Sequence, residues 1–246
     1  MKAFTGSAVA ALALMVAGCG GNDSAGNGAV ADQNFQVEQV AAPNGGDWTQ
    51  MVSETPQGGM LMGNPNARVK LVEFGSMTCS HCAAFAEEGA PNLIDKYVKS
   101  GQVSFEFRNF IRDPADLGAA ILARCNGPAA FFPLTEQLFA AQEEWLGRAQ
   151  SLSEAQQQQL QASAQPASAF AQALGLDQFV RARGVPAAKA QACLADQAQV
   201  QRLVQGTDSA GKEYQISGTP SFLINNKLAE ASDWKALEPL LQAALR

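Results

Sequence analysis

The pattern of hydrophobic and polar positions predicts a strand, a helix and a second strand in direct succession. Residues 67–74, ARVKLVEF, alternate in polarity and are rich in β-branched side chains, as is typical of a buried strand. Across residues 82–100 apolar side chains recur at helical spacing, and Pro91 should kink this helix because proline donates no backbone hydrogen bond. Gly101 should end the helix, and residues 102–110, QVSFEFRNF, are predicted to be the second strand. The order predicts a β-α-β unit.

The segment that follows has a different character, because it is rich in Ala, Gln and Leu and contains few β-branched runs. Asp113 followed by Pro114 is typical of a helix N-cap with proline in the first turn. Further prolines and glycines divide the segment, so we expect an all-helical insertion. Its helices are predicted at residues 114–126, 131–143, 152–164, 167–174, 176–183, 186–196 and 197–213.

Strand signals return near the C-terminus. Residues 219–225, TPSFLIN, are predicted to be a buried strand, followed by a turn and a short edge strand within residues 227–231. Residues 232–246 have the pattern of an amphipathic helix with Ser232 or Asp233 as its cap. The predicted fold class is therefore α/β, with a mixed sheet flanked by helices and a helical insertion.

The N-terminal residues 1–18 predict an export signal, because one lysine precedes an apolar run too short to span a bilayer. The run ends in VAG before Cys19, which resembles a bacterial lipobox, so we expect Cys19 to be lipidated; the alternative is a plain signal peptide with an incidental cysteine. Gly20 slightly favours the outer membrane, so we expect a lipid-anchored protein on the periplasmic side of the cell envelope. The predicted organisation is a lipoprotein signal peptide at 1–18, a flexible tether and N-terminal segment at 19–58, an α/β domain at 59–112 plus 214–246 and the insertion at 113–213.

Composition and charge exclude some classes of function. The chain has 246 residues, 47% of them hydrophobic, which is enough for one substantial core or one domain with an insertion. A net charge of −6 argues against nucleic acid as a partner, because phosphate binding requires clustered Lys and Arg. An oxidising compartment favours a structural disulfide between Cys125 and Cys193 in the insertion; the alternative is two buried free thiols.

The candidate chemistry lies in Cys79-Ser80-His81-Cys82, between the first strand and the helix. The pair could be a redox centre, half of a metal site or a chance spacing. A redox cysteine reacts as its thiolate, and Cys79 is predicted at a helix N-terminus, where backbone amides favour negative charge. His81 would stabilise that charge, and Cys82 is placed to resolve a mixed disulfide on Cys79. We therefore expect the pKa of Cys79 to fall to roughly 3.5–7.5.

Glu73 is a candidate proton relay to or from Cys82, because a buried carboxylate in the apolar run LVEF would lie near the pair. The alternative is that Glu73 points to solvent at the end of its strand. A metal site would lack ligands, since structural zinc needs four and the chain has a single histidine. We expect no metal and no cofactor.

The segments VKLVEFGSMTCSHCAAF and SGTPSFLIN together resemble the thioredoxin superfamily, and within it the DsbA-like thiol–disulfide oxidoreductases. The resemblance implies a thioredoxin fold with an inserted helical domain. It also implies that Pro220 is a cis-proline facing the cysteines and that the backbone around Thr219 binds substrate peptide. Ser80 departs from the Pro-His dipeptide of the best-known members. Thr219 also occurs in isomerases and reductases of the superfamily, so the direction of electron flow stays open.

The expected function is that of a cell-envelope thiol–disulfide oxidoreductase that oxidises cysteine pairs in exported proteins, with a membrane redox partner restoring its disulfide. A disulfide reductase or isomerase of the same fold is the alternative within this chemistry. We expect a monomer, because no dimerisation domain is visible. From other classes, a copper- or zinc-binding module and a non-catalytic binding lipoprotein remain alternatives.

Overall fold

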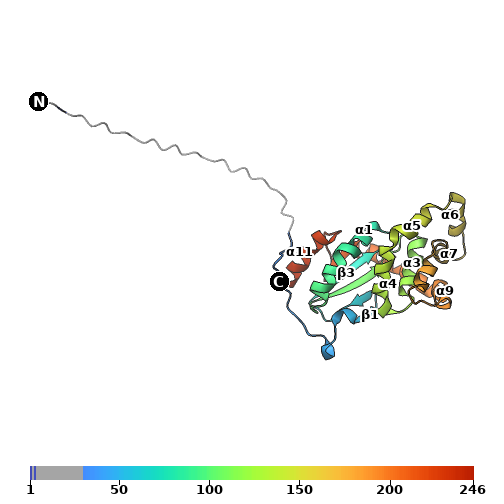
Figure 1. The fold of residues 1–246 in the computed structure, drawn as a ribbon, viewed down its shortest axis with the longest axis horizontal. Coiled ribbons are helices and arrows are strands. Elements are labelled where there is room, and N and C mark those ends of the chain that lie inside the picture. The colour runs from blue at the N-terminus through green and yellow to red at the C-terminus, as the bar shows by residue number, and fades with distance from the viewer. Residues whose placement is uncertain (2, 4–29) are drawn as a thin grey trace.

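A mixed sheet forms the centre of the computed structural model, which describes residues 1, 3 and 30–246 (Figure 1). Cys19, the predicted lipidation site, lies outside the described residues. The strand order is β1-β2-β4-β3-β5-β6. β3 and β4 pair in parallel and every other neighbouring pair is antiparallel. The strands are β1 (Val52–Glu54), β2 (Met60–Met62), β3 (Val69–Gly75), β4 (Val103–Asn109), β5 (Ser221–Ile224) and β6 (Lys227–Leu228).

One long helical segment connects the parallel strands β3 and β4, as the predicted β-α-β unit requires. It begins at Ser80, and π-helical turns lie on both sides of the short α2 turn that contains Pro91. Proline leaves one carbonyl without its helical donor, and wider turns are one way in which a helix accommodates that loss. The parts are α1 (Ser80–Ala84), η3 (Phe85–Gly89), α2 (Ala90–Asn92) and η4 (Leu93–Val98).

The two faces of the sheet are covered by different elements. On one face the Phe85 ring packs on Phe222 of β5 with centroids 4.8 Å apart, which places the β3–β4 helical segment against the sheet. On the other face Val72 and Phe74 of β3 form a small core with Ala210 and neighbouring residues near the C-terminal end of the insertion. Because side chains alternate along a strand, Glu73 points to the first face, beneath the helix that begins at Ser80.

The insertion is all-helical, and Figure 1 shows its outer helices gathered beside the sheet. Asp113 caps α3 as predicted, accepting a hydrogen bond from the backbone N–H of Asp116 at 2.8 Å, and Asp233 caps α11. One helix, α5, was missed, because the predicted helix at 131–143 ends where α5 begins and no element was predicted between residues 143 and 152. Within residues 30–246, no helix is both long and apolar enough to cross a bilayer. The helices are α3 (Pro114–Arg124), α4 (Pro128–Ala140), α5 (Gln142–Gln150), α6 (Glu154–Gln161), α7 (Pro166–Ala173), α8 (Leu176–Arg181), α9 (Ala187–Ala195), α10 (Gln197–Tyr214) and, after the sheet, α11 (Trp234–Leu245).

The N-terminal part of the described chain is more ordered than the sequence predicts. β1 lies within residues 19–58, the range assigned to a flexible tether and N-terminal segment, and three-residue strands such as β1 and β2 are too short to show alternation. Upstream, Asp32 accepts and donates hydrogen bonds with the Gln242 amide of α11, and the Trp48 indole donates to the Val40 carbonyl at 2.7 Å. Residues upstream of the predicted domain start at 59 therefore already pack on the domain. Two short 3-10 turns, η1 (Pro43–Gly45) and η2 (Trp48–Gln50), lie in this stretch.

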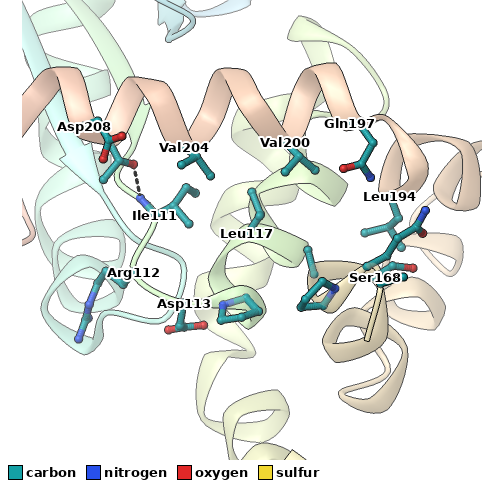
Figure 2. A pocket seen from close by; sticks show the side chains of 16 residues that line it. Ile111, Arg112, Asp113, Leu117, Ser168, Leu194, Gln197, Val200, Val204 and Asp208 are labelled. Carbon is teal, nitrogen blue, oxygen red and sulfur yellow. Dashed lines mark hydrogen bonds between the residues drawn. The ribbon is translucent and has the colours of Figure 1, made fainter. Parts of the chain in front are cut away.

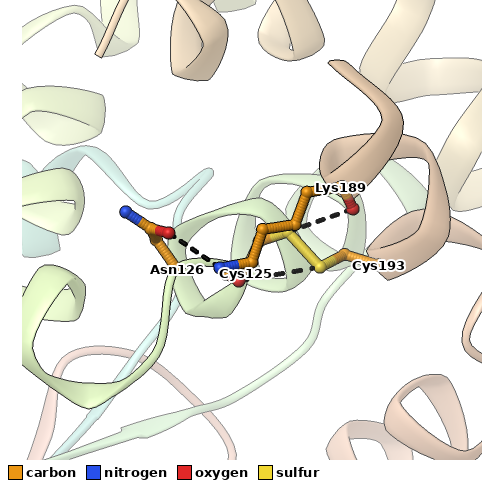
Figure 3. Close-up of a disulfide and its surroundings, with 4 residues drawn as sticks. All are labelled: Cys125, Asn126, Lys189 and Cys193. Atoms are coloured by element: carbon orange, nitrogen blue, oxygen red, sulfur yellow. Dashed lines mark hydrogen bonds between the residues drawn. A yellow bond between two sulfur atoms is a disulfide. The ribbon is translucent and has the colours of Figure 1, made fainter. Parts of the chain in front are cut away.

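A disulfide and a close helix contact hold the insertion together. Cys125 at the end of α3 is joined to Cys193 of α9, with Cα atoms 5.8 Å apart, although the two residues are 68 positions apart in sequence (Figure 3). Gly118 of α3 packs directly on α7, since a Cβ atom there would lie 2.6 Å from the carbonyl oxygen of Ala167. α3 is therefore tied to both α7 and α9.

Candidate functional site

Cys79 and Cys82 lie where β3 passes into the helical segment. Cys79 is the N-cap residue, in an extended conformation, and Cys82 lies in the first helical turn. Both are free thiols; the Cys82 side chain is fully buried and Cys79 is 5% exposed. The position of Cys79 in front of unpaired helix amides is the one that the sequence predicts.

The strand β5 brings a distant segment to the same point. The Thr219–Pro220 peptide bond is cis. The Cys79 Sγ atom lies 3.2 Å from the Thr219 carbonyl oxygen, although the two residues are 140 positions apart. The Thr219 Oγ1 atom is buried and has no geometrically defined hydrogen-bond partner among the described residues. Its hydroxyl is therefore available to a thiolate on Cys79.

The surroundings of Cys79 favour its thiolate strongly. They lower the pKa of Cys79 from 9.0 to about 4. The largest cause is a hydrogen bond from the Cys82 thiol; the Thr219 side chain and the backbone N–H groups of Cys82 and His81 add to it, while burial opposes it. Cys82 behaves in the opposite way, because burial raises its pKa and keeps it protonated. The pair thus combines a charged sulfur with a neutral one that donates to it.

His81 contributes through its backbone N–H. Its side chain is exposed, and no hydrogen bond of the imidazole is found within the part of the chain that the structure describes. Stabilisation of the Cys79 thiolate by the imidazole therefore remains a prediction.

Glu73 lies beneath the pair and is 2% exposed, so the alternative that it points to solvent is wrong. Burial raises the pKa of Glu73 well above 4.5, and a negative charge on Cys79 raises it further. A Glu73 carboxylate in turn raises the pKa of Cys82. Its Oε1 atom has no hydrogen-bond partner within residues 30–246. A buried, electrostatically coupled carboxyl group is suited to exchange a proton with Cys82, and that role stays a prediction.

Asp116 holds the turn before Cys79 in place. The sequence analysis did not predict this role. It is fully buried and accepts hydrogen bonds from the Ser76 hydroxyl and the Met77 backbone N–H, both at 2.7 Å, and from the backbone N–H of Arg112 at 2.9 Å. Burial raises the pKa of Asp116 to about 7 despite these donors. The sequence does contain a signal that could have identified Asp116, because it is an acidic residue within the apolar run of α3.

Two further side chains of the insertion reach the cysteine turn. The Thr78 hydroxyl donates to Asp113 Oδ2 at 2.9 Å, so the residue that caps α3 also contacts the neighbour of Cys79. Gln142 of α5 is buried, and its amide nitrogen donates to the carbonyl oxygens of Met77 at 2.8 Å and Cys79 at 3.0 Å. Nothing in the sequence around Gln142 distinguishes it from the other glutamines. The insertion therefore fixes the backbone of the reactive turn.

The remaining candidate residues are placed elsewhere. The Cys125–Cys193 disulfide joins two helices of the insertion, and Cys79 and Cys82 take no part in it. Considering only the described residues, no group of three or more His, Cys, Asp or Glu side chains is arranged to hold a metal ion. Two thiols that face a proline and a buried carboxyl group are a geometry for thiol–disulfide exchange.

Comparisons with known proteins agree with this geometry. A family model described as thioredoxin matches residues 55–243. "Putative protein-disulfide oxidoreductase" from Rickettsia bellii is 28% identical over 187 residues, which cover 76% of this chain and 64% of that protein. The chain thus spans just under two thirds of that relative's length.

Solved structures give a closer match. The crystal structure of a protein-disulfide isomerase from Novosphingobium aromaticivorans is 36% identical, with a TM-score of 0.73, over 76% of this chain and 96% of that one. The α-DsbA1 structure from Wolbachia pipientis has a TM-score of 0.62 at 20% identity, covering 78% of this chain and 92% of that one, and shares the fold. The predicted architecture, a mixed sheet flanked by helices with a helical insertion, is confirmed.

Proposed function

Because this chain belongs to the thioredoxin family, we propose that it is a thiol–disulfide oxidoreductase whose redox centre is Cys79 and Cys82. One observation carries the proposal. The pKa of Cys79 is lowered to about 4 while the buried Cys82 stays protonated beside it. A stabilised thiolate favours the dithiol form of the pair, which makes its disulfide a strong oxidant. The favoured direction is therefore oxidation of the substrate.

In the proposed reaction, a substrate thiolate attacks the Cys79 sulfur of the oxidised pair. The Cys79–Cys82 bond breaks, and its electron pair leaves on the Cys82 sulfur, which takes a proton from Glu73. A second substrate thiolate then attacks the substrate sulfur of the mixed disulfide, and Cys79 leaves as a thiolate. The substrate loses two electrons and gains a disulfide, and the protein gains the same two electrons as a dithiol.

The proposed substrates are exported polypeptides with reduced cysteine pairs. Thr219 and Pro220 lie beside Cys79 and line a shallow hollow of about 490 Å³, where an extended chain could bind the backbone around Thr219. We further propose lipid anchoring through Cys19, placement on the periplasmic side of the envelope, a monomeric state and a membrane partner that re-oxidises the pair.

A redox titration of the protein against glutathione tests the proposal. We expect a reduction potential well above the roughly −270 mV of thioredoxin. The Cys125→Ser/Cys193→Ser double variant is the matched control, because any titration that persists in it belongs to Cys79 and Cys82. A potential at or below that of thioredoxin would sink the oxidase direction, and a pair that does not titrate would sink the whole proposal.

Isomerisation is the second candidate, favoured by the name of the 36% identical Novosphingobium protein. An isomerase rearranges wrong disulfides and acts from its dithiol form. Reactivation of scrambled ribonuclease A by the reduced protein, in the absence of added thiols, would support it. Oxidation of reduced ribonuclease without such reactivation would support the oxidase.

A further inference from the structure

A cavity of about 390 Å³ lies between the β3–β4 helical segment and α4, with the sheet as its floor. Glu73 lines it from β3, so the cavity reaches the carboxyl group beneath Cys79 and Cys82. The π-helical turns η3 and η4 also contribute to its lining, and such turns are frequent at functional sites. The cavity thus has the volume of a small-molecule site and a place next to the proposed proton relay.

Two buried polar atoms in the lining of this cavity have no hydrogen-bond partner within residues 30–246. One is Oε1 of Glu73, which is 2% exposed, and the other is Oγ1 of Thr135 on α4, which is 5% exposed. Buried polar groups in proteins are normally hydrogen-bonded, and an unpaired one costs free energy. A bound molecule with a polar group at Glu73 would remove that cost.

Every ionisable side chain that lines the cavity is acidic. Asp95 and Glu136 are exposed and lie toward solvent, whereas Glu73 is buried. No lysine, arginine or histidine among the described residues lines the cavity. A positively charged molecule is therefore favoured over a negatively charged one.

Five aromatic rings form much of the apolar lining, and they come from the helical segment, the sheet and α4: Phe85, Phe105, Phe107, Phe132 and Phe139. The rings of Phe105 and Phe132 have centroids 5.6 Å apart. A Cβ atom on Gly75 would lie 2.5 Å from the Phe107 ring and 3.1 Å from Glu73 Oε1, so the ring and the carboxyl group approach the same point. Aromatic faces attract cations and form the cages that bind ammonium groups.

The groove beside α10, with a volume of about 380 Å³, is of a different kind (Figure 2). Its charged lining residues have both signs, namely Arg112, Asp113 and Asp208. The Thr207 hydroxyl that lines it is already paired, because it accepts a hydrogen bond from the Ile111 backbone N–H at 2.7 Å. The acidic, aromatic lining with unpaired polar atoms therefore distinguishes the cavity at Glu73.

We propose that the cavity at Glu73 binds a small organic cation, an ammonium group on an apolar body, with its positive charge beside the Glu73 carboxylate. The aromatic rings would surround the apolar body and the charge. Binding of this cation does not depend on the proposed function, but one consequence does. A cation beside Glu73 would hold the carboxyl group in its charged form, so it could not give a proton to the leaving Cys82 sulfur, and formation of the mixed disulfide would slow.

Calorimetric titration of the reduced protein with benzyltrimethylammonium tests the proposal. We expect saturable binding at least about tenfold tighter than that of benzyl alcohol, which has the ring alone, or tetramethylammonium, which has the charge alone. Burial raises the pKa of Glu73 well above 4.5, so at about pH 5 its neutral form dominates and binding should release a proton. Heats measured in two buffers of different ionisation enthalpy report that proton.

Three variants assign the binding to this cavity. Glu73→Gln keeps the shape of the side chain without its charge, so affinity should fall by about tenfold or more and the released proton should disappear. Phe132→Leu removes one ring at a half-buried position and should weaken binding by about threefold, which decides the question if Glu73→Gln does not fold. Glu87→Gln is the matched control, because Glu87 is exposed on η3 and does not line the cavity; it should change neither quantity.

Several outcomes would overturn the proposal. Absence of saturable binding would show that the cavity holds solvent alone, and equal affinity for benzyl alcohol would show that it does not select cations. Unchanged affinity in Glu73→Gln and Phe132→Leu would place the probe elsewhere, and an equal loss in Glu87→Gln would indicate general attraction to an acidic chain. Cys79→Ala/Cys82→Ala cannot exchange disulfides, yet it should still bind the probe, so failure of the proposed function leaves this test intact; loss of binding there would assign the cation to the cysteines. In an active wild type, an unchanged rate of mixed-disulfide formation with saturating probe would refute the effect on Glu73.

Discussion

The reduced protein should carry a thiolate on Cys79 far below the pH at which free cysteine ionises. A pKa of about 4 gives roughly a thousand thiolates per thiol at pH 7, whereas a pKa of 9.0 gives about one per hundred. Lowering the pH of the reduced protein is therefore the perturbation, and the thiolate should disappear with a midpoint near 4. The structural cause is the set of donors around the sulfur, above all the Cys82 thiol.

The thiolate's ultraviolet absorbance, recorded while reduced protein is titrated with acid, measures this midpoint. A Cys79→Ser variant supplies the baseline, because it keeps every other titrating group. In Cys82→Ala the strongest donor is gone, so the midpoint should rise toward that of free cysteine. A wild-type midpoint at or above pH 7 would refute the reasoning, since the donors would then fail to outweigh burial.

The same pKa makes the stability of the reduced protein depend on pH. The pKa of Cys79 in the folded state lies below its unfolded value. The stabilisation that the Cys79 thiolate gives the folded protein is therefore fully present above about pH 9 and is lost as pH falls through about 4. From pH 7 to below pH 4 the free energy of unfolding falls by at most about 4 kcal/mol through this group, and solvent screening near the surface reduces that loss. The difference between urea unfolding curves of the wild type and Cys79→Ala isolates this contribution.

Three further changes have defined outcomes. The Cys125→Ser/Cys193→Ser double variant should lose about 4 kcal/mol of unfolding free energy in urea, because the disulfide closes a loop of about 68 residues. Glu73→Gln should slow formation of the mixed disulfide on Cys79 by about a hundredfold when the oxidised protein meets reduced substrate, seen by acid quenching and mass spectrometry, because the proton donor to the leaving Cys82 sulfur is gone. Gly118→Ala should cost about 1–3 kcal/mol in the same urea assay, since its Cβ atom would overlap the backbone of α7.

Each of these results has a clear contrary outcome. A loss below about 1 kcal/mol in the double cysteine variant would show that the bridge does not constrain the unfolded chain. A wild-type rate of mixed-disulfide formation in Glu73→Gln would show that Glu73 does not relay the proton. Gly147→Ala is the control for Gly118→Ala, because a Cβ atom there meets nothing within 4 Å; equal effects at both positions would contradict close packing of α3 on α7.

Local signals in the sequence predicted the parts of the fold that depend on neighbouring residues. The alternation in β3 and the helical spacing after Cys79 placed the cysteines at a strand-to-helix turn, which the structure shows. The caps Asp113 and Asp233 were predictable for the same reason, since a cap contacts its own first turn. Pro220 was expected opposite the pair only through the resemblance, because spacing alone does not reveal which distant segment meets a turn.

The parts that could not be predicted depend on contacts between distant segments. β2 is a strand because β4 offers it an edge to pair with, and β1 pairs in turn with β2; three residues carry no pattern of their own. Gln142 reaches the cysteine turn from 63 positions away, and its neighbours in the sequence do not indicate this. Asp116 was visible as an acid in an apolar helix, but its three acceptor bonds required the position of the turn.

The disulfide between α3 and α9 has a consequence for how the protein itself matures. The bond joins the end of α3 to α9, so it holds these two helices of the insertion together. Under the proposed export, a new copy carries Cys125 and Cys193 as thiols in an unfolded chain, which is the proposed kind of substrate. An enzyme of this type would also oxidise the cysteines of its own newly made copies. Its first molecules would depend on another oxidant, and later ones would be completed by those already present.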